Sequence, residues 1–447
     1  MESPRTGETE GATRLVSRSA AVSSPDVRAF LASSPSPRVV WDAPDGPTVV
    51  ASGTAAALTA SGEDRFEAIR SRAEGLFAGD SEGVGADPAR PRLFGGFAFH
   101  ADGDEQSPWR GFPGARFVLP SVQVTCADGD AWLTVNATGP DAEATVEERL
   151  ATARERLDAL GDPGPVADPP GVVARTRTTS PSAWRESVTE AIDRIDAGEL
   201  RKVVLAQALR TDLSRPVSLP DVLARLGERN PDCYRFLVEP PSGDAGFFGA
   251  TPERLVARHG RRVDTGALAG TTGRGDTSEE DEWLATELLA DEKNVHEHQL
   301  VADAIREQLS AVASSVTTGE RRIRRLATVQ HLFTPISAEL ATDEHVLSLV
   351  EALHPTPAVG GLPPDRALAT IRETEPFDRG WYAAPVGWFD AAGDGEFAVA
   401  IRSAVARDDT ATLFAGVGLV ADSDPDREWD EVQLKYRPIL DALERPA

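Results

Sequence analysis

Short apolar runs typical of β-strands recur along the chain, and stretches with helical periodicity separate them. Five such runs lie before residue 136, together with helical stretches near residues 63–77 and 143–159. Further strands are expected at residues 202–209, 234–238, 246–249, 262–264, 397–401 and 412–414. Long helices are expected at about residues 278–311, 341–353 and 426–443. Strands that look antiparallel, mixed with long helices, predict an α+β fold of mixed α/β layers.

Turn-forming residues divide the chain into four parts. Residues 1–25 are polar with little periodicity, which predicts a flexible leader. Residues 26–160 are expected to form the N-terminal part of the fold. Residues 161–179 are rich in Pro, Gly and Asp, which predicts a linker or a long exposed loop. Residues 180–447 carry most of the chemically distinctive motifs and open on Ser-Pro, a pair typical of a helix start.

The composition indicates a halophilic cytoplasmic protein. Of its 447 residues, 40% are hydrophobic, which is enough for a sizeable core. The 72 acidic and 46 basic residues leave a net charge of −26, which disfavours nucleic acid and anionic membranes as partners. No apolar run approaches 18 residues and residues 1–20 carry no secretory signal, so neither a membrane span nor export is expected. Cys126 and Cys233 are too few for a zinc site or a disulfide framework.

Lysine is rare in this chain, so the positions that retain it are candidates for function. Only Lys202, Lys293 and Lys435 among the 46 basic residues are not arginine. Lys202 begins a strand so apolar that both of its faces are expected to be buried. Most lysines are solvated surface charges, but a partly desolvated lysine has a lowered pKa and becomes a usable base.

Three glutamates are candidates for an acid and for metal ligands. Glu253 follows Phe-Phe-Gly-Ala-Thr-Pro, where an ordinary first-turn helix carboxylate is the plainer interpretation. Glu297 and Glu431 each lie one helical turn from a lysine, a spacing that usually only supports a helix. Carboxylates from two helices can also share Mg²⁺, which accepts one or two of them and fills its shell with water and substrate.

Two glycine-containing loops and two further side chains complete the candidate binding residues. The loops at residues 267–271 and 414–419 offer backbone N–H groups that can hold an anion. Arg402 ends an expected strand and can clamp a carboxylate through two hydrogen bonds. His354 precedes a loop held by two prolines, where a structural and a functional role are both open.

Taken in chain order, these segments resemble the chorismate-utilising enzyme family. The matching motifs are Lys202-Val-Val-Leu-Ala, Phe248-Gly-Ala-Thr-Pro-Glu253-Arg-Leu, Leu268-Ala-Gly-Thr271, Asp291-Glu-Lys-Asn-Val-His-Glu297-His, His354-Pro-Thr-Pro-Ala, Glu375-Pro-Phe-Asp-Arg379-Gly, Arg402 with Phe414-Ala-Gly-Val-Gly418, and Glu428-Trp-Asp-Glu431. Eight motifs in the right order are specific, although each one alone is weak. The resemblance implies sheets flanked by helices, with residues 180–447 as the chorismate-binding catalytic region.

The resemblance also implies a role for each matching residue. Glu297 and Glu431 stand where the family places its two Mg²⁺-binding glutamates. Glu253 matches the general acid that helps the C4 hydroxyl to leave, and Lys202 matches the base that activates water for attack at C2. The positions implied to bind chorismate are Ala269, Gly270, Thr271, His354, Arg402, Gly416, Gly418 and Lys435.

Lysine at position 202 further implies one activity within the family. Members that make isochorismate or salicylate carry this lysine, whereas members that use ammonia generally do not, and Ala269 argues against aminodeoxychorismate formation. The implied activity is a Mg²⁺-dependent isomerase that makes isochorismate, for menaquinone or for siderophores. A salicylate synthase and a non-catalytic binding homologue are the alternatives. Gln207 and Gly266 differ from the residues that many members of the family carry at these positions. No glutamine amidotransferase subunit is expected, and a monomer is the default.

Overall fold

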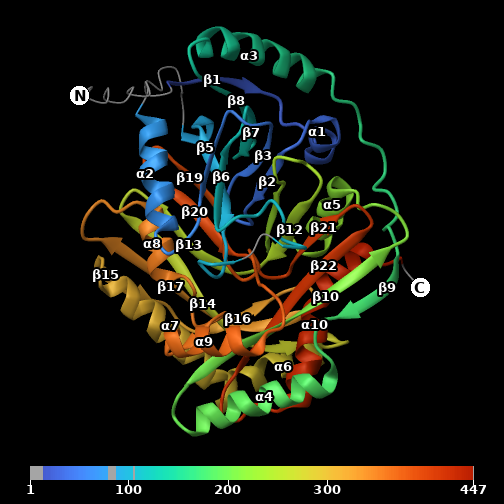
Figure 1. Cartoon of the computed structure of the whole chain (residues 1–447), viewed down its shortest axis with the longest axis vertical. Coiled ribbons are helices and arrows are strands. Elements are labelled where there is room, and N and C mark those ends of the chain that lie inside the picture. The colour runs from blue at the N-terminus through green and yellow to red at the C-terminus, as the bar shows by residue number, and fades with distance from the viewer. Residues whose placement is uncertain (1–13, 79–86, 104–105, 446–447) are drawn as a thin grey trace, which may run out of the picture.

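The computed structural model describes residues 14–78, 87–103 and 106–445, which form two large antiparallel sheets flanked by helices (Figure 1). The first sheet runs in the order β1 (Leu15–Val22), β8 (Asp130–Thr138), β7 (Val122–Ala127), β3 (Thr48–Ser52), β2 (Arg38–Asp42), β11 (Tyr234–Val238), β12 (Gly246–Thr251), β21 (Ser403–Arg407), β22 (Thr410–Leu419), β10 (Lys202–Leu213) and β18 (Gly361–Leu362), with β9 (Val172–Arg177) also paired to β10. The predicted α+β class is confirmed.

The second sheet runs in the order β15 (Ala313–Thr318), β17 (Val329–Leu340), β14 (Arg262–Gly273), β13 (Arg254–His259), β20 (Gly395–Val399), β19 (Pro385–Asp390), β5 (Arg92–Phe97), β6 (Ala115–Leu119) and β4 (Ala56–Ala60), with β16 (Arg322–Arg325) paired to β17. Residues from both sheets belong to one contiguous apolar core. Trp109 lies in the connection between β5 and β6 of the second sheet, and its ring packs on Phe247 of β12 and Phe414 of β22 in the first sheet. Both sheets therefore pack around the same core and form one folding unit.

The helices cover the outer faces of the sheets. They are α1 (Val27–Ser33), α2 (Arg65–Phe77), α3 (Ala142–Asp158), α4 (Pro181–Asp196), α5 (Leu219–Arg229), α6 (Ser278–Ala290), α7 (Glu292–Ser310), α8 (Val346–Leu353), α9 (Pro364–Thr374) and α10 (Pro425–Leu443), with a short 3₁₀ helix at Asp87–Ala89. Helix α3 packs on β1 and β8, α7 packs on β14, and α10 packs on β22 (Figure 1). None of the helices in the described ranges is long and apolar enough to cross a membrane.

Side-chain caps set the starts of the helices that carry the motifs. The Ser180 hydroxyl accepts from the N–H of Ala183 at the start of α4, as the Ser-Pro pair predicts. Asp424 accepts from the N–H groups of Asp426 and Arg427 at the start of α10. These caps satisfy backbone donors that have no partner inside the helix.

The expected helix at residues 278–311 is wrong in one respect, because the structure breaks it at Asp291. This residue has extended backbone angles. Its N–H donates to the carbonyl of Glu287 at the end of α6, and its side chain accepts a hydrogen bond from the N–H of Asn294 at the start of α7. An aspartate competes well as a helix cap because its short carboxylate reaches exposed backbone donors. The break therefore gives α7 a start of its own, capped by Asp291.

Two segments expected to be irregular contribute strands. Within the expected leader, residues 15–22 form β1 and pair with β8, and residues 1–13 lie outside the described part of the chain. Within the expected linker, residues 172–177 form β9 and pair with β10. The side chains of β9 are mostly exposed, so its polar sequence carries no strand pattern. Pairing with an open sheet edge uses backbone groups, which explains why the side-chain pattern did not reveal it.

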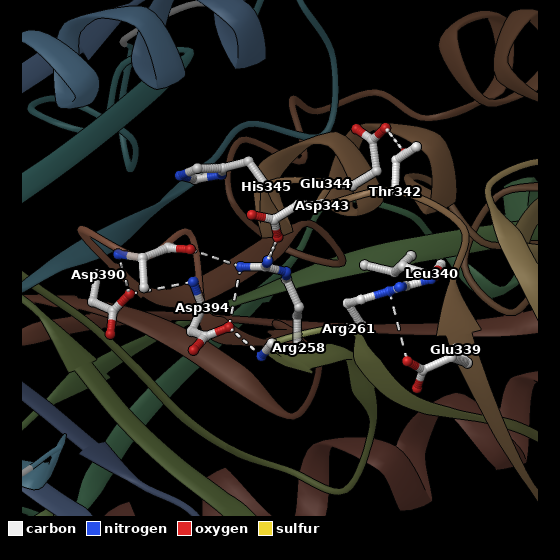
Figure 2. Close-up of polar contacts among 12 residues, drawn as sticks. Arg258, Arg261, Glu339, Leu340, Thr342, Asp343, Glu344, His345, Asp390 and Asp394 are labelled. Carbon is white, nitrogen blue, oxygen red and sulfur yellow. Dashed lines mark hydrogen bonds and ion pairs between the residues drawn. The ribbon is translucent and has the colours of Figure 1, made fainter.

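A buried arginine ties the turns at one end of the second sheet together (Figure 2). Arg258 of β13 donates to the carbonyl of Ala392 at 2.9 Å and to Asp394 at 3.1 Å, and it also pairs with Asp343. The N–H of Gly260 donates to the same Asp394 carboxylate at 2.7 Å. These contacts join the β13–β14 and β19–β20 turns to the segment before α8, so we read this polar cluster as structural.

Candidate active site

An inner cavity of about 60 Å³ lies where the ends of β10, β14 and β22 meet helices α7 and α10. Its lining residues include Glu253, Leu268, Ala269, Gly270, Thr271, Glu297, His331, Tyr382, Arg402, Phe414, Gly416, Gly418, Glu431 and Lys435. The structure thus brings together ten of the twelve predicted site residues on one lining. An eleventh, Lys202, lies directly behind it, and the twelfth is His354.

All three lysines of the chain lie at this site, each paired with a glutamate. The Nζ of Lys202 lies 2.9 Å from Glu297 and that of Lys435 lies 2.7 Å from Glu431, in addition to donating to the carbonyl of Gly416 at 2.9 Å. Lys293 and Glu428 form the third pair at 2.7 Å. Each lysine of the chain is therefore paired with a glutamate of α7 or α10.

Lys202 is completely buried, as its apolar strand predicts. It is the first residue of β10, and its partner Glu297 is also buried on α7. Burial opposes ionisation of Glu297, but Lys202, Lys435 and Lys293 outweigh burial and lower the pKa of that carboxyl. Glu297 is therefore held as a carboxylate in the interior.

The pKa of Glu253 is raised, whereas that of Glu297 is lowered. It lies between β12 and β13, where Thr251 donates its hydroxyl to the carbonyl of Val399 at 2.6 Å and the N–H of Val399 donates to the Glu253 carbonyl at 3.0 Å. Burial raises the pKa of Glu253 to about 7, although Lys202, Lys435 and Arg402 act to lower it. Near neutral pH this group exists in both protonation states, which is what a proton donor requires.

Glu253 also faces a second, larger space. A cavity of about 820 Å³ shares Glu253 and Leu268 with the inner cavity, and its lining includes Arg254, Arg262, Arg322, Arg324 and Arg325. Arg324 is among the charges that lower the pKa of Glu253. Glu253 therefore stands in the wall between a narrow buried chamber and a wide arginine-rich one.

Two glycines make room for the ion pairs and the loop. A Cβ atom on Gly418 would lie 2.2 Å from Oε1 of Glu297 and 2.8 Å from Cε of Lys202, so only glycine fits there. Gly270 has a φ of +75°, a conformation that other residues rarely adopt. The N–H of the next residue, Thr271, donates to the side chain of Asn294 on α7 at 3.2 Å.

Arg402 is buried in the cavity wall with a strained backbone. Its φ is +51°, which is uncommon for a side chain of this size, and such strain is often found at functional sites. Burial lowers the pKa of its guanidinium, against the raising effect of Tyr382, Cys233, Glu431 and Glu253. A guanidinium aimed into a buried cavity is suited to a carboxylate ligand.

His331 is a cavity residue that the sequence reasoning missed. It lies on β17, and its Nδ1 is 3.0 Å from the Thr271 hydroxyl, while the buried Nε2 has no hydrogen-bond partner in the described structure. Burial holds the pKa of His331 well below its ordinary value, so the ring is neutral. The sequence offers one weak indication of this role, a histidine inside a run that is otherwise typical of a strand.

His354 is not brought into the cavity. Its Nε2 lies 3.2 Å from the carbonyl of Phe99, and its ring packs edge-on against the Phe99 ring and near Phe66. Burial lowers the pKa of His354 to about 3. These contacts give it a packing role, so the expectation that it binds substrate has no support in the geometry.

The two predicted metal-binding glutamates come from two helices and line the same chamber. Glu297 lies on α7 and Glu431 on α10. Their donor set consists of carboxylate oxygens alone, which suits a hard cation such as Mg²⁺. No cluster of three or more His, Cys, Asp or Glu side chains that could form a metal cage is found in the described ranges. The residues present therefore fit an ion that takes two protein carboxylates and completes its shell with other oxygens.

Comparisons with known proteins show the family to which the chain is similar. The family model described as "Chorismate binding enzyme" matches residues 3–444. Isochorismate synthase MenF of Bacillus subtilis is 39% identical over 357 residues, which cover 79% of this chain and 74% of that protein. The salicylate biosynthesis isochorismate synthase of Pseudomonas aeruginosa is 38% identical over 414 residues, covering 91% and 85%.

Solved structures show the same architecture. The structure of MenF, the menaquinone-specific isochorismate synthase from Escherichia coli, matches with a TM-score of 0.79 at 27% identity, covering 97% of this chain and 96% of that one. Anthranilate synthase component I from Streptococcus pneumoniae matches with a TM-score of 0.74 at 21% identity, which shows a shared fold alone. By sequence and by structure, the chain belongs to the chorismate-binding enzyme family.

Proposed function

We propose that this protein is an isochorismate synthase, an isomerase that converts chorismate to isochorismate. Water attacks C2 of the ring and the C4 hydroxyl leaves. The observation that carries the proposal is that Glu253, between β12 and β13, lines the inner cavity, while Lys202, the first residue of β10, lies directly behind that lining. The names of the relatives from Bacillus subtilis and Pseudomonas aeruginosa support the same activity.

The two residues divide the proton transfers of this reaction between them. Lys202 is the base that takes a proton from the attacking water, and Glu253 is the acid that gives a proton to the departing hydroxyl. With a pKa of about 7, Glu253 keeps a substantial protonated fraction near neutral pH. Residues that act as acid and base on one ring need environments that differ, and burial raises the pKa of Glu253. The Lys202 ammonium, which pairs with Glu297, must first give up a proton before its neutral amine can take one from water.

The remaining lining residues are suited to a dianionic substrate. Arg402 and Lys435 offer positive charge, and Gly416 and Gly418 bring backbone close to the chamber. The loop at residues 269–271 supplies the opposite wall. A protein with a net charge of −26 needs such local positive charge to bind a dicarboxylate.

We also propose that Glu297 and Glu431 hold Mg²⁺. When bound, this ion orients a substrate carboxylate and offsets its negative charge. Each of the two glutamates forms an ion pair with a lysine, Glu297 with Lys202 and Glu431 with Lys435.

The biological setting is part of the proposal. Menaquinone formation is the pathway we favour, because relatives from Bacillus subtilis and Haemophilus influenzae, among others, carry the name MenF. We expect the enzyme to act in the cytoplasm, as a monomer and without an amidotransferase subunit. Cys126 and Cys233 are both free thiols, which agrees with a reducing compartment.

The test is to incubate the purified protein with chorismate, Mg²⁺ and high salt, and to resolve the products by chromatography. We expect isochorismate without release of pyruvate. Salicylate together with pyruvate would instead identify a salicylate synthase. Bound but unchanged chorismate would contradict an enzymatic role and indicate a binding protein.

A further inference from the structure

One motif of the sequence, Glu375-Pro-Phe-Asp-Arg379-Gly, has no role in the site described so far. Its arginine and glutamate form an ion pair in which the two side chains are only 1% and 3% exposed. Nε of Arg379 donates to Oε2 of Glu375 at 2.8 Å, and the guanidinium lies 4.4 Å from the centre of the Phe99 ring. A buried ion pair is weak evidence of stabilisation, because the desolvation of two charges offsets most of their attraction. The other contacts of the pair show what it does.

The pair fills a gap at one edge of β10. On its other edge this strand pairs with β22 along nearly its whole length. On this edge it pairs with β18 only at its first two residues and with β9 only from Leu209 onward. Between these partners, the N–H of Ala206 donates to Oε1 of Glu375 at 2.8 Å, and Arg379 donates to the carbonyl of Val204 at 2.8 Å. The two side chains therefore satisfy backbone groups of β10 that neither strand reaches.

Arg379 also joins β10 to the loop that precedes β18. Its Nη1 donates to the carbonyl of Val359 in that loop at 2.8 Å, while its Nη2 donates to Val204. Val204 and Val359 both line the inner cavity, whereas Arg379 and Glu375 do not. Lys202 is two residues before Val204, so the two side chains are on the same face of the strand. One guanidinium thus holds two parts of the cavity wall together from behind.

We propose that the Glu375–Arg379 pair is a positioning element, which fixes β10 against the loop before β18 and so places Lys202 and the cavity wall for the reaction. This inference rests on the proposed function, because Lys202 acts there as the base. It assigns a role to two residues that do not line the cavity. Arginine suits this role, because its planar fork reaches two carbonyls and a carboxylate at once, whereas lysine offers a single nitrogen.

The variant that tests this role is E375M/R379M, which removes both charges together and leaves neither of them buried without a partner. It also removes the hydrogen bonds to Val204, Ala206 and Val359. We expect kcat per folded molecule to fall about a hundredfold, the loss that a displacement of about 1 Å at a reacting group can cause. The change in equilibrium binding of chorismate should be smaller, because Arg402 and Lys435 remain in place.

The matched control is R258M. Arg258 is 2% exposed and also donates to a backbone carbonyl and to a carboxylate, but its cluster joins turns of the second sheet and does not line the cavity. We expect R258M to lower the melting temperature without lowering kcat per folded molecule. Chromatography of the products gives kcat and KM well below the melting temperature, and circular dichroism gives the folded fraction. Hydrogen–deuterium exchange at residues 202–208 should accelerate in E375M/R379M and not in R258M.

A folded E375M/R379M with the kcat of the wild type would overturn the proposal. An equal loss of kcat per folded molecule in R258M would overturn it too, since the effect would then follow stability in general. If E375M/R379M does not fold, R379K takes its place, because it keeps the charge without the fork. We expect R379K to have a lowered kcat, and a wild-type value would again overturn the proposal. A wild type that makes no isochorismate would refute the proposed function and this inference with it, whereas the other outcomes concern the positioning role alone.

Discussion

Replacing Glu253 with glutamine should stabilise the protein at alkaline pH while it removes the proposed proton donor. In the unfolded chain this carboxyl ionises near 4.5, whereas in the folded protein its pKa is about 7. Between these values the folded state holds a proton that the unfolded state releases. Stability therefore falls as the pH rises from about 4.5 to 7, and the full penalty applies above 7.

The size of this penalty follows from the two pKa values. The difference between 4.5 and about 7 corresponds to about 3 kcal/mol of unfolding free energy, because each pKa unit is worth about 1.4 kcal/mol. Glutamine has a similar shape and no charge to bury. E253Q should therefore exceed the wild type in stability by up to about 3 kcal/mol at pH 8.5, with a much smaller difference near pH 4.5.

Urea denaturation of both proteins at several pH values measures this difference, and chromatography of the products measures activity. A buried glutamate with a partner is the matched control. Glu239 is 1% exposed and receives the guanidinium of Arg38, with Nε 3.0 Å from Oε2. E239Q should be destabilised at neutral pH, because it weakens a buried ion pair. A stability difference between E253Q and wild type that does not change with pH would refute the reasoning.

Three further substitutions test the other site residues. K202A should stop isochorismate formation while equilibrium binding of chorismate persists, and continued turnover would show that Lys202 is not the base. E431Q should raise the Mg²⁺ concentration needed for half-maximal activity, and an unchanged metal titration would remove Glu431 from the site. G418A should cost about 1–3 kcal/mol in urea unfolding and most of the activity, because its Cβ would overlap the Lys202–Glu297 pair. An active, equally stable G418A would show that the pair can move freely.

The rare lysines illustrate how far sequence reasoning reaches in this protein. Their scarcity marked them as candidates, and the structure places all three in one cluster. The helical spacing also predicted the Glu431–Lys435 contact correctly, since both residues lie on one helix. It suggested a contact between Lys293 and Glu297, whereas the structure pairs Lys293 with Glu428 and Glu297 with Lys202. The spacing of residues on one helix does not show which residues of other helices or strands will form ion pairs with them.

Two histidines also show that sequence motifs do not reveal every residue that lines the cavity. His354 belongs to a motif, yet its ring packs against Phe99 outside the inner cavity. His331 belongs to no motif that was singled out, yet it lines the cavity beside Thr271. Whether a histidine is a packed ring or a site residue depends on what the neighbouring strands and helices place around it, which residue type alone does not indicate.

The amino-acid sequence by itself determined the fold class and the family, because ordered motifs and strand or helix periodicity are local properties. It also predicted eleven residues that the structure places at the inner cavity or directly behind it. The tertiary structure alone decided which carboxylate each lysine balances and where the helix before α7 breaks. It also decided that residues 15–22 and 172–177 complete the first sheet. Lys293 and Glu428 are 135 residues apart, and only the packing of α7 and α10 around the chamber brings their charges together. Ion pairing and burial act through space, so their partners are settled by the folded arrangement.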